Sequence, residues 1–295
     1  VGYLRPSSPW YVPTSQGTYE WSTGIQWNVS IPDTPDYPGD IWFGDPLGQC
    51  PISVMDNVMF VIMETYSHSY HEIGYDINTG QQLWIHNTTQ WTWMRATGEG
   101  VYADFHSPSR TWTGYDVNTG NQLWQSDPPQ DYPWGLYVAA NTHIADGKLL
   151  VPSYDGCVHA YDITNGKQVW KFYGGDTTET PYGTYPFYYG PMTAGGVVFA
   201  GQSEHSPTQP FLRGLKFHAI EAQASGGIWN ITGSMSPAAI ADGYLLTVNG
   251  YDNRLYCFGK GPSAMTVEAP KTAVPKGTAV MITGTITDQS AGAKG

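Results

Sequence analysis

The chain has few cysteines, few charges and no long apolar run, and each shortage excludes a class of protein. Its three cysteines, Cys50, Cys157 and Cys257, are scattered and form no CxxC pair, so neither a disulfide framework nor a cysteine metal knuckle is predicted. Lys and Arg number 13 against 25 Asp and Glu, and the formal net charge of −12 excludes the basic footprint of a nucleic-acid-binding protein. No apolar stretch of about 18 residues occurs, so no transmembrane helix is predicted.

Helical periodicity is missing as well, and turn residues take its place. The chain holds 35 Gly and 22 Pro with only 13% charged residues, which is typical of a turn-rich β protein rather than a helical or disordered one. In residues 144–170, short apolar or alternating runs are separated by Asp-Gly and Thr-Asn-Gly turn signals. This spacing predicts an all-β meander.

A short motif recurs along the chain: a Tyr-Asp pair, a turn with glycine, and a Trp that follows the pair after about eight residues. It occurs in residues 74–84 (GYDINTGQQLW), 114–124 (GYDVNTGNQLW) and 160–170 (AYDITNGKQVW), more weakly in 218–229, and in degenerate form before Trp27. We expect the turn glycines to adopt positive φ and the Trp rings to pack between neighbouring repeats. These residues are Gly80, Gly120 and Gly166, and Trp27, Trp84, Trp124, Trp170 and Trp229.

A recurring unit of roughly 40–50 residues indicates a repeat architecture. One four-stranded meander leaves a face and two edges unburied, so the predicted fold is a β-propeller of four-stranded antiparallel blades. About six blades are recognisable in residues 1–261, and about seven or eight are expected in the full protein. Only a strand or two precede Trp27, so the first blade is incomplete and we interpret the chain as a processed product or fragment. Residues 262–295 have the pattern of a linker and the truncated start of an immunoglobulin-like β-sandwich module.

The repeat pattern DGxLLVxSxDGxVxAYDxxTGxxxW resembles that of the quinoprotein-like (PQQ-like) propellers. The match is strongest in residues 145–170, and looser copies cover roughly residues 15–261. This family includes quinone-dependent alcohol dehydrogenases and the non-enzymatic assembly lipoprotein BamB, and the chain is closest in character to BamB-like and archaeal cell-surface propellers. The resemblance implies that each blade Trp docks against the neighbouring blade. It implies no single activity, because catalytic and inert members share the repeat.

The predicted loops are unequal: one face carries minimal hairpins, and the other carries long loops rich in aromatic residues and histidine. Function concentrates in such loops on a rigid scaffold, so we predict a binding face there. The alternative is that these loops pack on each other and cover the axis. The predicted binding residues are Trp91, Trp93, Trp112, Trp134, Tyr185, Tyr188, Tyr189 and His205.

Catalytic and metal signals are weak. Members of the family that act as quinone dehydrogenases have adjacent cysteines beside the cofactor and Glu, Asn and Asp around Ca²⁺. This chain has no Cys-Cys pair, and Glu204, Asn249 and Asp252 match those ligands in residue type alone. His68 and His71 form a weak candidate site for Zn²⁺ or Cu²⁺, without a third ligand fixed by the sequence. We therefore expect no cofactor in the main hypothesis, and PQQ with Ca²⁺ in the alternative.

Three sequons follow blade tryptophans at the expected end of the outermost strand, and this recurrence favours an exported glycoprotein. Their asparagines are Asn28, Asn87 and Asn230. We predict a non-enzymatic, extracellular or cell-surface propeller that offers its long-loop face to a protein, a glycan or a neighbouring subunit, in an oligomer or larger surface complex. The alternatives are a PQQ- and Ca²⁺-dependent alcohol or sugar dehydrogenase, and a structural subunit of a surface assembly.

Overall fold

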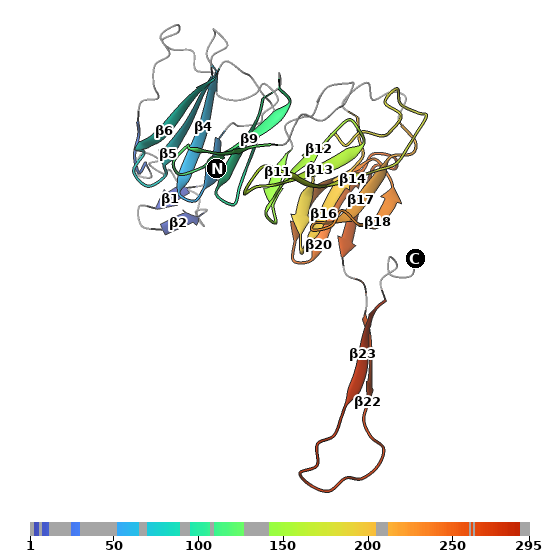
Figure 1. Ribbon diagram of the computed structural model, residues 1–295. Coiled ribbons are helices and arrows are strands. Elements are labelled where there is room, and N and C mark those ends of the chain that lie inside the picture. Colours follow the sequence, from blue (N-terminus) through green and yellow to red (C-terminus); the bar gives the residue numbers. More distant parts are fainter. Residues whose placement is uncertain are drawn as a thin grey trace, which may run out of the picture. The chain divides into compact units, whose positions relative to one another are not determined.

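The structure is a computed structural model that describes residues 3–5, 8–11, 25–29, 52–64, 70–88, 95–106, 109–126, 142–204, 212–259, 261 and 263–289. Over these residues the regular elements are all strands, and the sheets that they form are antiparallel (Figure 1). The prediction of an all-β chain built of small antiparallel sheets is confirmed. Within the same residues, no helix has the length and apolar character needed to cross a membrane.

Four of the sheets have four strands in consecutive order, as expected of propeller blades. The first contains β3 (Ile52–Met55), β4 (Val58–Glu64), β5 (Tyr70–Asp76) and β6 (Gln82–Thr88). The second contains β7 (Arg95–Gly98), β8 (Val101–His106), β9 (Thr111–Asp116) and β10 (Gln122–Gln125). The third contains β11 (His143–Ala145), β12 (Lys148–Pro152), β13 (Cys157–Asp162) and β14 (Gln168–Tyr173). The fourth contains β15 (Met192–Ala194), β16 (Val197–Gly201), β17 (Lys216–Glu221) and β18 (Gly227–Thr232).

The remaining sheets of the described residues are smaller. A three-stranded sheet contains β19 (Met235–Ala241), β20 (Tyr244–Asn249) and β21 (Arg254–Gly259), and β1 (Tyr3–Arg5) pairs with β2 (Ser8–Tyr11). The tail forms a hairpin of β22 (Ser263–Glu268) and β23 (Thr283–Asp288), in register from Ser263–Asp288 to Glu268–Thr283. Its likeness to an immunoglobulin module and the total number of blades remain predictions.

The chain divides into two compact units, Val1–Val151 with His159–Lys171, and Pro152–Val158 with Phe172–Gly295. The core of the first unit contains Phe105, Trp112, Trp124, Leu149 and Val151, all at most 5% exposed. In the second unit, Phe217, Met235 and Leu245 are buried, and Phe199, Trp229 and Phe258 pack against them. Each core is formed by the alternate, inward-facing residues of its strands.

In the first unit, the Trp that ends one repeat lies against the glycine turn of the following repeat. The Trp84 indole donates a hydrogen bond to the Val117 carbonyl over 2.8 Å, and a Cβ placed on Gly120 would lie 2.7 Å from the ring. Gly120 has φ +69°, so the turn needs glycine both for its backbone and for the approach of the ring. The same contact recurs between Trp27 and Gly80 and between Trp124 and Gly166.

Two of these rings also meet a second glycine. A Cβ on Gly74 would lie 2.4 Å from Trp84, and one on Gly114 would lie 2.1 Å from Trp124. These glycines belong to β5 and β9, each in the same blade as the ring. Trp84 and Trp124 are therefore each held in a slot formed by a strand glycine of their own blade and a turn glycine of the next.

Aspartates fix the turns on which the rings lie. Oδ1 of Asp116 accepts hydrogen bonds from the amides of Asn118 and Thr119 and from the Thr119 hydroxyl, over 2.8 to 3.0 Å. Asp76 makes the equivalent bonds in the preceding repeat. Because side-chain and then backbone hydrogen bonds from Thr164 stabilise its charged form, the pKa of Asp162 is lowered. The recurring Asp thus has a structural use.

Candidate functional site

The predicted binding residues separate into three groups. Trp91, Trp93, Trp134 and His205 lie outside the described residues. Tyr185, Tyr188 and Tyr189 are described and lie on the connection between β14 and β15. Trp112 contradicts its assignment: it is the second residue of β9, its ring packs 5.1 Å from that of Phe105, and it is only 1% exposed. Strand alternation turns it inward, so Trp112 belongs to the core and not to an exposed binding face.

The connection between β14 and β15 carries a cluster of tyrosines that is held by Glu204. The Tyr154 hydroxyl donates to Oε1 of Glu204 over 2.6 Å, and the Tyr154 ring packs edge-on at 5.3 Å from Tyr182 and 6.4 Å from Tyr188. Tyr188 packs in turn against Tyr189, at 5.0 Å, and Tyr189 is 45% exposed. The cluster therefore begins in the interior and ends at the surface.

A second carboxylate fixes the same connection. Glu179 accepts a hydrogen bond of 2.7 Å from the Tyr185 hydroxyl and one of 2.8 Å from the Arg213 amide. In that order these two bonds lower the pKa of Glu179, because each stabilises the carboxylate. The amides of Tyr188 and Tyr189 both point at Oγ of Ser203, over 3.3 Å each. Hydrogen bonds thus hold the tyrosines in place before any partner arrives. We refer to Tyr182, Tyr185, Tyr188 and Tyr189 as the tyrosine segment.

A buried charge cluster joins the first two blades of the first unit. Glu72 on β5 is 2% exposed and accepts a 2.7 Å hydrogen bond from the Tyr102 hydroxyl. The Arg95 guanidinium lies 3.5 Å from Glu72 and 3.5 Å from Asp104. Burial, followed by the charge of Glu72, raises the pKa of Asp104 well above its usual range. One cation between two carboxylates links adjacent blades, and no repeat signal in the sequence predicts it.

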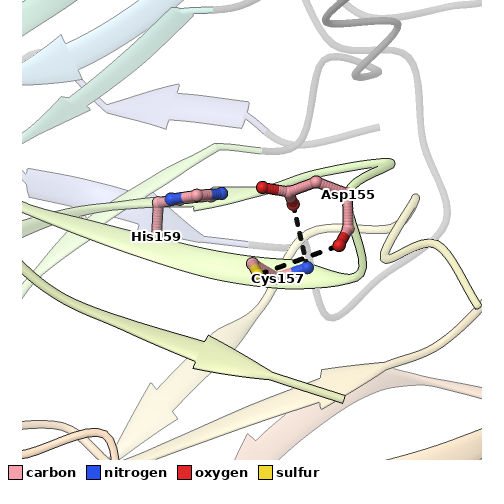
Figure 2. A group of neighbouring side chains, drawn as sticks. All are labelled: Asp155, Cys157 and His159. Atoms are coloured by element: carbon pink, nitrogen blue, oxygen red, sulfur yellow. Dashed lines mark hydrogen bonds between the residues drawn. The ribbon is translucent and has the colours of Figure 1, made fainter. Parts of the chain in front are cut away.

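The hairpin between β12 and β13 places three potential metal ligands together (Figure 2). Asp155, Cys157 and His159 each offer one ligand atom, and these atoms lie within 4.8 Å of one another. Cys157 and His159 are two residues apart on β13, so both side chains lie on the same face of the strand. Asp155 is fixed by the Cys157 amide, which donates to its Oδ1 over 2.9 Å.

No metal site is predicted here from the sequence, because the three cysteines form no CxxC pair and Asp155-Gly156 is a turn signal. The signal was present in the spacing: Asp-x-Cys-x-His puts three ligand types at every second position. The histidines that were proposed as metal ligands stay untested. His68 lies outside the described residues, and only the backbone of His71 is described, on β5.

The residues present do not fit a quinone and Ca²⁺ site. None of the three cysteines is adjacent to another. Asn249 uses its Oδ1 to accept from the amides of Ser234 and Tyr251, and Asp252 accepts from the Arg254 amide and the Tyr256 hydroxyl. With Glu204 held by Tyr154, each candidate ligand has a local role in a turn or loop.

The three sequon asparagines are exposed. Asn28 follows Trp27 directly, Asn87 lies on β6, and Asn230 lies on β18. An exposed asparagine leaves room for a bulky sugar. Glycosylation itself remains a prediction.

Known proteins are similar to the chain over most of its length. A family model described as "Outer membrane protein assembly factor BamB" matches residues 24–264. The quinohemoprotein alcohol dehydrogenase of Comamonas testosteroni is 13% identical with TM-score 0.49, over 72% of this chain and 42% of that one. A europium-containing methanol dehydrogenase is 13% identical with TM-score 0.47, over 71% of this chain and 50% of that one. BamB of Moraxella catarrhalis is 16% identical with TM-score 0.38, over 70% of each chain.

The chain spans half the length of the methanol dehydrogenase and less than half of the alcohol dehydrogenase. No curated relative matches it in sequence. Structural likeness at such low identity concerns the fold and not the activity.

Proposed function

The chain belongs to the PQQ-like repeat β-propeller family of the assembly factor BamB, and from this membership we propose that it is a non-enzymatic propeller for binding and assembly. The family match covers residues 24–264, which include every four-stranded blade of the described residues. The recurring Trp, Gly and Asp of the repeat are occupied in blade docking and in turns. Function therefore rests on residues outside the repeat motif.

The observation that carries the proposal is the tyrosine segment. Its hydroxyls and amides are tied to Glu179, Glu204 and Ser203, and its outermost ring, Tyr189, is 45% exposed. Tyrosine supplies a large contact area with few rotatable bonds, and a segment that is already ordered loses little entropy on binding. A partner protein, or a glycan whose sugar faces stack on aromatic rings, fits such a surface.

The negative charge of the chain favours a partner with a basic surface. The chain carries a formal net charge of −12, and Glu179 and Glu204 both lie within the tyrosine segment's hydrogen-bond network. A partner with a basic contact surface would associate faster with this face than a neutral or acidic one. We place the encounter outside the cell or at its surface, which agrees with three exposed sequon asparagines.

The experiment compares two exposed tyrosines that differ in location. Tyr189→Ala removes the outermost ring of the segment, and Tyr244→Ala removes a 58% exposed ring next to the short Asp242-Gly243 turn. Partners are cross-linked on intact native cells and identified by quantitative mass spectrometry. Loss of an aromatic interface anchor typically costs about 2 kcal/mol or more, so Tyr189→Ala should reduce partner recovery about tenfold or more. Tyr244→Ala should leave it unchanged.

Two outcomes overturn the proposal. The first is a partner that depends on Tyr244 and not on Tyr189, since the binding face would then lie elsewhere. The second is dye reduction with an alcohol or sugar after addition of PQQ and Ca²⁺ to the purified chain, since this would establish the dehydrogenase alternative. Recovery of only identical chains, still dependent on Tyr189, would identify the partner as a neighbouring subunit.

A further inference from the structure

The hairpin of residues 155–159 brings a carboxylate, a thiol and an imidazole to one side of the chain (Figure 2). We propose that Asp155, Cys157 and His159 form a binding site for a transition-metal dication, with Zn²⁺ as the preferred ion. The site is independent of the tyrosine segment's proposed role in binding a partner. It also differs from the Ca²⁺ site of the quinone enzymes in the chemistry of its ligands.

The local backbone explains why the three ligands meet. Gly156, with φ +74°, closes the turn, and the amide of Cys157 donates to Oδ1 of Asp155 over 2.9 Å. That bond orients the carboxylate in the way that outer-sphere hydrogen bonds orient metal ligands. The two-residue period of β13 then brings His159 to the same face as Cys157. All three ligands lie within five consecutive residues, so their proximity is a property of the hairpin.

The ligand set selects the metal. A thiolate and an imidazole favour Zn²⁺ and similar ions, whereas Ca²⁺ and Mg²⁺ require oxygen ligands. Zinc–ligand bonds of about 2.0–2.3 Å place tetrahedral ligands about 3.3–3.8 Å apart. The ligand atoms now lie within 4.8 Å of one another, so a closure of about 1.5 Å or less would form the site. A thiolate and a carboxylate together neutralise the charge of a dication.

Burial determines the access and the coordination number. Cys157 is 4% and His159 2% exposed, whereas Asp155 is half-buried, so the ion would enter past the carboxylate. Three protein ligands leave a fourth position for water or an external donor, as in open zinc sites. The turn also accepts hydrogen bonds from Gly174 at the Gly156 carbonyl and from Phe187 at the Ser153 carbonyl. A bound ion would therefore stiffen the base of the connection that carries the tyrosine segment.

The test titrates chelator-treated full-length protein with Zn²⁺ by calorimetry and with Co²⁺ by absorption spectroscopy. We expect one ion per chain and a thiolate-to-cobalt charge-transfer band. Cys157→Ser should abolish that band, and His159→Gln should weaken Zn²⁺ binding by more than about tenfold. Binding should also tighten as pH rises, because the thiol loses its proton when the metal binds.

The matched control is Cys257→Ser, since Cys257 is an exposed free cysteine on β21, and this variant should bind Zn²⁺ like the parent. If Cys157→Ser fails to fold, Asp155→Asn carries the test, because its half-buried side chain can change with little effect on the fold, and it should weaken binding at least about tenfold. Absence of stoichiometric Zn²⁺ binding would overturn the proposal. So would a cobalt complex without a thiolate band, or unchanged affinity in Asp155→Asn.

Discussion

Two glycines with the same backbone conformation allow the contribution of the Trp docking contact to stability to be measured separately from backbone strain. Gly166 and Gly147 both have φ +73°, and both lie in turns of the first unit. A Cβ on Gly166 would lie 2.5 Å from the Trp124 ring, whereas a Cβ on Gly147 would meet nothing within 4 Å. Gly166→Ala and Gly147→Ala therefore impose the same backbone strain, and the first alone disturbs the docked ring.

The expected costs follow from these two contributions. An alanine forced into left-handed backbone costs about 1–2 kcal/mol, which should be the whole effect of Gly147→Ala. Overpacking a filled site costs about 1–3 kcal/mol more. Gly166→Ala should therefore lower the free energy of unfolding by about 2–5 kcal/mol. Trp124→Ala should cost about 3–5 kcal/mol, because it empties a buried aromatic site.

The assay is equilibrium unfolding in urea followed by circular dichroism, with the double variant Gly166→Ala/Trp124→Ala completing a cycle. Once the ring is removed, Gly166→Ala should cost less than in the parent, because only the backbone strain of about 1–2 kcal/mol and the contact with the Gln125 carbonyl, 3.0 Å from such a Cβ, remain. Equal costs for Gly147→Ala and Gly166→Ala in the parent would refute the reasoning. So would a cost of Gly166→Ala that does not change when Trp124 is absent.

Three further predictions rest on other parts of the structure. Burial lowers the pKa of His218 to about 4 from 6.5, so protonation of this side chain opposes folding. The stability present above pH 6.5 should fall by about 3 kcal/mol as the pH drops towards 4, at about 1.4 kcal/mol per pKa unit. In unfolding measured as a function of pH, His218→Leu should remove this loss. Arg95→Met should cost about 3–5 kcal/mol at pH 7, because Glu72 and Asp104 lose their shared cation. Since the pKa of Asp104 is raised, its protonated form is favoured by folding and this deficit should shrink on acidification; a deficit independent of pH would contradict the cluster. Intact-mass analysis of native material should show sugar on the exposed sequon asparagines, which are Asn28, Asn87 and Asn230. Unmodified asparagine at all three positions would remove this support for export.

The sequence predicts what recurs and misses what occurs once. The pairing of Trp84 with a turn glycine follows from a motif written several times, because each copy makes the same contact with its neighbour. Trp112 was predicted to lie on a long loop of the binding face, yet β9 already begins at Thr111 and strand alternation buries the ring. The Asp155–Cys157–His159 group has no counterpart in the other repeats.

The buried charge cluster marks a different limit of sequence reasoning. Glu72, Arg95 and Asp104 come from three strands of two blades: β7 and β8 pair with each other, whereas β5 belongs to a different sheet. No spacing rule predicts such a meeting, because it depends on the register between β7 and β8 and on the packing of adjacent sheets. The low content of charged residues is a partial signal, because charged side chains are almost never fully buried unless they are paired.

The slot that holds each docked Trp gives the array of repeats a direction. Every such ring is supplied by one repeat and received partly by the following one, so the coupling is polar and limited to nearest neighbours. Excision of residues 85–124 would place Trp84 before Gly166 and join a ring to a slot of the same kind. Excision of a segment that is not a whole number of repeats would leave one Trp ring without a slot and one slot without a ring. The chain should therefore tolerate the gain or loss of whole repeats, because each docking contact is restored at the new junction. The gain or loss of part of a repeat should lower its stability.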